Sequence, residues 1–313
     1  MKKILYVLFA VIALTQSGCQ SDPLEDIEQG NWNNERNVLE IKFENQVGSA
    51  QVVRVDNQTG TINLAINVGA VPDLSHIVIK ELVLSYGGKS SVNEGEALNF
   101  ENAQHSATLT VTSPSGKSRN YTVIASSFRE SLVGTFDVDN LVVYGGTGPE
   151  YGGGAVLAMT DKPWIWSAAE GPDKELDNQL VFKMDGITED GNTYGTVTNT
   201  AGADGKYADF VYVGTPLTDV KKFYRQIPSG EGKWLRNYAT GTITFTFADG
   251  TAKVGTFENA GTENLGNSST KTIANNAFAF NLNGTDDWDK IYSDYDKFVK
   301  KPRRFWIDVT KLD

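Results

Sequence analysis

Residues 242–257 read TITFTFADGTAKVGTF, and this stretch indicates the fold class. Apolar and polar side chains alternate along residues 242–247, and an Asp249-Gly250 pair then separates this run from a second one. Alternation with a period of two is typical of a strand with one buried face, and Asp-Gly between two such runs is typical of a β-hairpin. The stretch therefore predicts two antiparallel strands, whose core-facing residues are Ile243, Phe245 and Phe247.

Short runs of the same kind fill the N-terminal third of the chain. They occupy residues 38–43, 51–55, 61–68, 77–86, 107–112 and 119–124, with turn-forming residues between them. About seven strands in about ninety residues are typical of a small immunoglobulin-like sandwich. We therefore expect an Ig-like β-sandwich over residues 37–128, followed by a larger β domain over residues 129–313.

The larger domain has long alternating strands and long loops, which favour a jelly-roll-like β-sandwich. The alternative is a lipocalin-like barrel, because residues 134–136 (Gly-Thr-Phe) resemble the opening of that family, with phenylalanine in place of its usual tryptophan. Residues 305–309 alternate and are expected to close the sheet. Apolar residues at spacings of three and four between Trp288 and Val299 predict one short amphipathic helix, packed on the sheet. The expected fold class is all-β with one short helix.

The N-terminus has the pattern of an export signal. Lys2 and Lys3 precede an apolar stretch over residues 4–14, which is too short to span a bilayer, so residues 1–18 are predicted to be a signal peptide. Ser17-Gly18 directly precedes Cys19, the only cysteine of the chain, and this sequence resembles a bacterial lipobox. The resemblance implies that Cys19 is lipidated and that residues 19–36 form a polar tether. An ordinary secretory signal with an incidental cysteine is the alternative.

Acidic residues follow Cys19 at Asp22, Glu25 and Asp26, and they resemble the surface-export signal of Bacteroidota lipoproteins. The turn at residues 56–60 and the strand pair over residues 110–123 are similar to the Ig-like modules found next to the anchor in these proteins. The resemblance implies an outer-membrane lipoprotein on the cell surface, in which residues 37–128 act as a spacer. It also implies kinship with the glycan-binding lipoproteins of polysaccharide-utilisation systems.

Charge and motif content exclude several other classes. The chain has 28 basic and 39 acidic residues, and this net charge of −11 repels the phosphate backbone of nucleic acids. His76 and His105 lie far apart with no cysteine beside them, which argues against a zinc site. The glycine-rich run over residues 144–154 lacks the Gly-Lys-Ser/Thr of a phosphate loop, so we expect a flexible surface loop or lid there.

Aromatic and polar side chains gather in two stretches of the larger domain. If residues 164–166 form a strand, alternation places both indoles on one face, where they could stack on sugar rings. The second stretch combines rings with hydrogen-bonding groups, which also suits carbohydrate recognition. The same rings could instead be half-buried in a sheet or pin a long loop onto it. The candidate ligand-binding residues are Trp164, Trp166, Tyr224, Arg225, Trp234, Arg236 and Asn237.

These residues favour a protein that binds a polysaccharide or oligosaccharide by aromatic stacking and is not an enzyme. No cofactor is expected, although Asp204 and Asp209 could hold calcium with loop carbonyls. A glycoside hydrolase is the alternative, since carboxylates such as Glu175 and Asp177 could serve as an acid/base pair. A third hypothesis is a structural or adhesive envelope protein that contacts other envelope proteins and has no small ligand.

Overall fold

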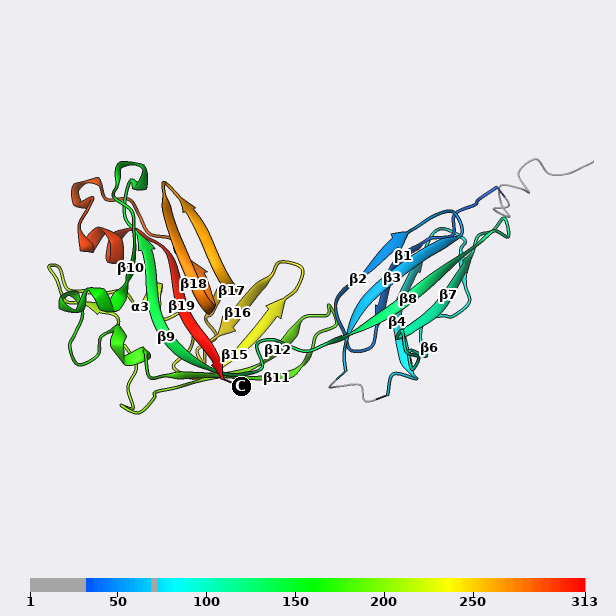
Figure 1. The fold of residues 1–313 in the computed structure, drawn as a ribbon, viewed down its shortest axis with the longest axis horizontal. Coiled ribbons are helices and arrows are strands. Elements are labelled where there is room, and N and C mark those ends of the chain that lie inside the picture. Colours follow the sequence, from blue (N-terminus) through cyan, green and yellow to red (C-terminus); the bar gives the residue numbers. More distant parts are fainter. Residues whose placement is uncertain (1–31, 69–72, 313) are drawn as a thin grey trace, which may run out of the picture. The chain divides into compact units, whose positions relative to one another are not determined.

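A computed structural model describes residues 32–68 and 73–312 of the chain. The predicted signal peptide, Cys19 and most of the predicted tether lie outside the described residues. The chain divides into two compact units, one comprising residues 1–46 and 50–127 and the other residues 47–49 and 128–313. Strands dominate both units (Figure 1), which confirms the all-β prediction.

The first unit is a sandwich of two β-sheets. Its strands are β1 (Val38–Phe43), β2 (Gln46–Arg54), β3 (Thr59–Asn67), β4 (Ile77–Leu84), β5 (Lys89–Ser90), β6 (Ala97–Leu98), β7 (Ser106–Thr112) and β8 (Ser118–Phe128). One sheet has the order β1-β4-β6 and the other the order β2-β3-β8-β7-β5. Ile62, Leu64 and Ile66 on β3 are buried in the core of this unit, as their alternation predicts.

The second unit contains a closed antiparallel sheet. Its strands are β9 (Gly134–Gly145), β10 (Ala155–Ala158), β11 (Gln179–Ile187), β12 (Thr193–Thr200), β13 (Val211–Tyr212), β14 (Thr218–Asp219), β15 (Gly230–Asn237), β16 (Thr242–Thr246), β17 (Ala252–Gly266), β18 (Ser269–Asn281) and β19 (Pro302–Leu312). The order β9-β11-β12-β15-β16-β17-β18-β19 returns to β9, because β19 also pairs with β9. The eight strands therefore form an up-and-down barrel, with β10 as an additional neighbour of β9. The jelly-roll arrangement is wrong, and the barrel alternative describes the unit.

Two predicted elements account for much of this closure. Residues 242–257 form the β16–β17 hairpin, with Ile243 and Phe245 fully buried. Residues 305–309 lie in β19, as their alternation predicts, and its pairing with β9 closes the sheet into a barrel. Alternation sends Phe305 and Ile307 into the barrel, while Trp306 packs in a smaller cluster on the other face.

Side chains fill the barrel interior. Phe182 stacks on Phe278 with ring centroids 5.3 Å apart, and Phe136 meets both rings edge-on at 5.7 and 6.1 Å. A cavity near Leu180 and Phe305 measures only about 10 Å³, no more than the ~10–15 Å³ that a single water molecule needs. The barrel is therefore a packed core, as an eight-stranded barrel can be, and a ligand would have to displace these rings to enter.

The helical segments of residues 32–68 and 73–312 are short. They comprise the α-helix α3 (Lys221–Tyr224), one-turn 3-10 segments at Pro149–Tyr151, Met159–Asp161, Pro163–Ile165, Pro172–Glu175 and Trp288–Lys290, and a π-helix at Asp296–Lys300. The continuous amphipathic helix predicted between Trp288 and Val299 is wrong. Ile291 is extended at ψ 138° and Tyr292 has φ 74°, so the chain leaves the helical conformation between the two short segments. Among the described residues, no helix is long and apolar enough to cross a bilayer.

We expect Phe278→Ala to lower the free energy of unfolding by about 3–5 kcal/mol, because it removes the ring that four other phenylalanines contact and leaves a cavity. Urea unfolding followed by tryptophan fluorescence measures this change. Val254→Ala, at an exposed position of β17, is the control and should stay within about 0.5 kcal/mol of the unsubstituted protein. Equal costs for the two substitutions would contradict the packed interior.

Candidate functional site

The two tryptophans predicted to share a face are separated by the structure. Residues 164–166 do not form a strand, because Pro163 begins a 3-10 turn there. Trp166 is buried, donates from Nε1 to the carbonyl of Met159 at 3.0 Å, and meets Phe298 edge-on at 5.6 Å. Trp164 is 65% exposed. The predicted pair of coplanar indoles is therefore wrong, and only Trp164 of the two faces solvent.

Tyr224 and Trp234 are also core residues. Tyr224 is buried and donates its hydroxyl to the carbonyl of Phe298 at 2.6 Å, and burial raises the pKa of this hydroxyl well above its ordinary value. Trp234 is buried on β15, and its Nε1 donates to the carbonyls of Lys183 and Thr196. The prediction that these two rings bind ligand is wrong, because their faces pack against other side chains and their polar atoms are hydrogen-bonded.

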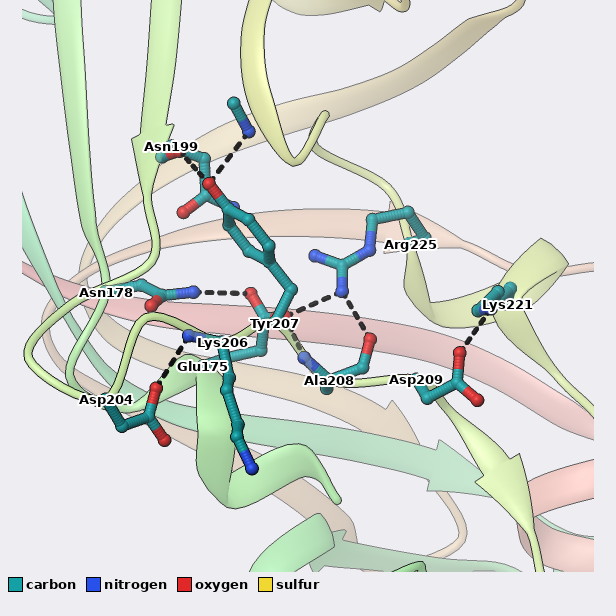
Figure 2. Close-up of polar contacts among 11 residues, drawn as sticks. Glu175, Asn178, Asn199, Asp204, Lys206, Tyr207, Ala208, Asp209, Lys221 and Arg225 are labelled. Carbon is teal, nitrogen blue, oxygen red and sulfur yellow. Dashed lines mark hydrogen bonds and ion pairs between the residues drawn. The ribbon is translucent and has the colours of Figure 1, made fainter. Parts of the chain in front are cut away.

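Arg225 lies in a buried polar cluster (Figure 2). Its Nη2 donates to Glu175 Oε1 at 2.7 Å and to the carbonyl of Ala208 at 2.6 Å. The amide of Ala208 and the side chain of Asn178 donate to the same carboxylate. The guanidinium also lies over the Phe210 ring, 4.9 Å from its centroid. Arg225 and Glu175 thus hold the loop before β13 in place.

The structure pairs both aspartates of the calcium prediction with lysines. Asp204 forms an ion pair with Lys174 at 3.3 Å and accepts the amide of Lys206. Asp209 forms an ion pair with Lys221, toward which it turns in Figure 2. Within residues 32–68 and 73–312, no three carboxylate, histidine or cysteine side chains gather as a metal site would need.

Arg236 and Asn237 at the end of β15 also have structural roles. Arg236 Nη1 donates to the buried Glu130 carboxylate at 2.8 Å, and Thr193 and Tyr238 donate their hydroxyls to its other oxygen. Burial opposes ionisation, but the hydrogen bonds from Thr193 and Tyr238 and the charge of Arg236 hold the pKa of Glu130 below its ordinary value. Asn237 Oδ1 accepts two backbone amides of the turn before β16. Arg236 Nη1 and Asn237 Oδ1 are therefore both used within the fold.

Exposed aromatic rings gather elsewhere, on the two loops at one rim of the barrel. Tyr151, Trp288 and Tyr292 are 65%, 56% and 60% exposed, and we call this group the rim platform. Tyr151 and Trp288 meet with ring centroids 6.0 Å apart, and the Tyr292 hydroxyl donates to the carbonyl of Tyr151 at 3.1 Å. The two loops follow β9 and precede β19, which are neighbours in the barrel (Figure 1). The closure of the barrel therefore brings the platform together.

A buried carboxylate ties the two loops to each other. Asp296 is fully buried, and its two oxygens accept the Thr147 amide at 2.6 Å and the Thr147 hydroxyl at 2.8 Å. The Thr147 hydroxyl in turn accepts the amide of Asp287. A Cβ on Gly145 would lie 2.1 Å from the carbonyl oxygen of Lys297, so this close approach of the two loops requires glycine. Residues 144–148 are buried, and the predicted flexible lid is instead a pinned turn.

Trp164 is linked to the same rim through charged side chains. Lys162 Nζ lies 5.1 Å from the centroid of the Trp164 ring and forms an ion pair with Asp294 at 3.1 Å. Asp294 follows Tyr292 by two residues, so this ion pair connects the turn that carries Trp164 to a loop of the rim platform. The rim therefore combines exposed rings with an adjacent cation and carboxylate.

The sequence predicted only one of these four exposed rings, Trp164, as a ligand-binding residue. Trp288 and Tyr292 have helical spacing, which placed them on a buried helical face. Their neighbours gave a contrary signal, because Asp286, Asp287 and Asp289 surround Trp288 with charge that is difficult to bury. Tyr151 follows a buried turn, and Asp296, which holds this turn in place, lies far away in the sequence.

No protein-family model matches the chain, and no curated protein matches it significantly. Among solved structures, one match is to a crystal structure of a "putative secreted protein" from Bacteroides fragilis, with 12% identity and a TM-score of 0.23. The alignment covers 31% of this chain and 98% of that chain.

The lowered pKa of Glu130 predicts a pH-dependent contribution to stability. The ionised carboxylate stabilises the fold at neutral pH, and this stabilisation is lost as the pH falls through the lowered pKa. Glu130→Gln should therefore cost about 1–3 kcal/mol of unfolding free energy at pH 7, and the difference from the unsubstituted protein should shrink toward pH 3. Urea unfolding across this pH range, with the exposed Glu231→Gln as control, measures it. A difference that stays constant with pH would contradict the assignment.

Proposed function

We propose that the protein is an exported, lipid-anchored protein of the cell envelope that binds glycans through the rim platform. The observation that carries the proposal is the group of exposed rings at Tyr151, Trp288 and Tyr292, held on loops that are tied to the barrel. The residues first predicted to bind glycan have no part in it, except Trp164. The proposed binding surface therefore lies at the rim of the barrel and not on its strands.

Exposing aromatic rings to water costs free energy. Large apolar rings gain free energy when they leave water, so a cluster of them on a surface favours a ligand or partner that covers them. Tyrosine and tryptophan suit such surfaces because each joins an apolar face to a polar tip. Sugar rings have apolar C–H faces and polar edges, and they complement this combination.

Preorganisation supports binding rather than only packing. Asp296 fixes Thr147, and Tyr292 is hydrogen-bonded to Tyr151, so little conformational entropy remains to be lost when a ligand arrives. Lys162 and Asp294, each partly exposed, lie beside the rings and can bind hydroxyl groups. A small number of polar groups beside apolar rings is typical of ligand sites.

The packed interior also favours a surface site over an enclosed one. The cavity beside Leu180 and Phe305 is about 10 Å³, so a sugar ring cannot enter it. The carboxylates of Glu130 and Glu175 are both buried in ion pairs with arginine, so a binding protein is favoured over a glycoside hydrolase that uses either one. Export and anchoring rest on the sequence of residues 1–19 and on its resemblance to Bacteroidota lipoproteins.

The rim platform is tested with a panel of neutral polysaccharides by affinity gel electrophoresis, followed by calorimetry on the retained glycan. Trp288→Ala should weaken binding by about 2 kcal/mol, more than tenfold, because it removes a central stacking face. Tyr194→Ala is the matched control, since Tyr194 is exposed on β12, which is not paired with β9 or β19. Retention of no glycan, or equal binding by the two variants, would refute the proposal.

The lipid anchor is tested separately in the producing cell. Metabolic labelling with a fatty acid should mark the protein and place it in the membrane fraction, whereas Cys19→Ala should remove both the label and the attachment. Protease treatment of intact cells then reports surface exposure. An unlabelled protein that fractionates identically with and without Cys19 would show an ordinary secretory signal.

A further inference from the structure

A groove lies in the first unit, in the module that the sequence predicts to be a spacer. It has a volume of about 750 Å³, and its lining includes Trp32, Arg36, Arg54, Tyr86 and Arg119. The chain segment before β1, the last residue of β2, the residues after β4 and the start of β8 provide these side chains. The volume is in the range of small-molecule sites, ~300–1,000 Å³.

Arg119 is the residue that most needs an explanation. The alternation of β8 places it on the same buried face as Tyr121 and Val123, and it is only 7% exposed. Its Nη1 donates to the side chain of Asn37, but its Nε is buried without a hydrogen-bond partner. A buried charged donor that is left unpaired costs free energy, and folded proteins seldom leave one in place. Arg119 also lines the groove, so an anion bound there would lie beside its guanidinium.

The groove is rich in positive charge, although Glu35 lines it and the charge of Asp56 interacts with that of Arg119. None of Arg36, Arg54 and Arg119 forms an ion pair within the described part of the chain, although the protein has 39 acidic residues. Arg36 is committed to three backbone carbonyls, which fixes the segment before β1. The Glu35 side chain is exposed. Arg54 and Arg119 therefore remain as the groups for an anion.

Two exposed rings define the class of ligand further. Trp32 is 62% exposed and Tyr86 is 82% exposed, and both line the groove beside the arginines. A planar guanidinium binds a carboxylate with two parallel hydrogen bonds, and an aromatic face packs on the apolar face of a sugar. We propose that this groove binds a uronic-acid unit of a short acidic oligosaccharide, with Arg119 and Arg54 on its carboxylate and an aromatic ring against its pyranose.

Isothermal titration calorimetry of the purified protein with trigalacturonate tests this site. The methyl ester of the same trisaccharide, which lacks the negative charge, is titrated for comparison. We expect the acid to bind at low salt, more weakly at high salt, and the ester to bind at least about tenfold more weakly. Arg54→Ala and Arg119→Lys should each weaken binding of the acid by about tenfold or more, because lysine keeps the charge but not the guanidinium fork. Arg129→Ala, an exposed arginine outside the groove, is the matched control and should leave binding unchanged.

Thermal unfolding of each variant shows whether Arg119→Lys still folds. If it does not, the binding of trigalacturonate by Arg54→Ala tests the site. Trp288→Ala should bind trigalacturonate normally, so failure of the rim platform and failure of this groove are distinguishable. Absence of binding by the unsubstituted protein, equal binding of acid and ester, or unchanged binding by Arg54→Ala would each overturn the proposal.

Discussion

The aromatic packing inside the barrel determines where this unit can bind a ligand. Phe136, Phe182 and Phe278 fill the interior of the barrel, which the pairing of β19 with β9 closes. Each ring gives up water-exposed apolar surface, so emptying the interior for a ligand would cost several kcal/mol per ring. Because the interior of the barrel is full, a ligand can be recognised only on the outer surface or at the rims of this unit.

At the rim, a second interaction determines whether exposed rings can act as a site. Asp296 receives both the amide and the hydroxyl of Thr147, and it thereby joins the loop after β9 to the loop before β19. Thr147 and Asp296 are 149 positions apart in the sequence. Without this junction, Tyr151 and Trp288 would be rings on two independent loops, and ordering them would oppose binding.

Local patterns allowed much of the fold to be predicted from sequence. The β16–β17 hairpin, β3 and β19 all follow from alternation, because a buried face repeats every second residue. The barrel closure and the rim platform could not be predicted with the same certainty, since they depend on contacts between distant segments. Trp166 shows the limit most clearly, because Pro163 turns the expected strand into a 3-10 turn and buries one indole of the pair. Arg119, in contrast, stands out in the alternation of β8, although only the structure shows its unpaired Nε.

Amide hydrogen exchange in the unliganded protein tests the pinned rim most directly. The amides of Gly146, Thr147 and Gly153 donate to Lys301, Asp296 and Gly148, so we expect them to exchange as slowly as amides in the strands of the barrel. Fast exchange at these three amides, at the rate of an exposed loop, would show that the rings of the rim platform are not held in place and would contradict the account.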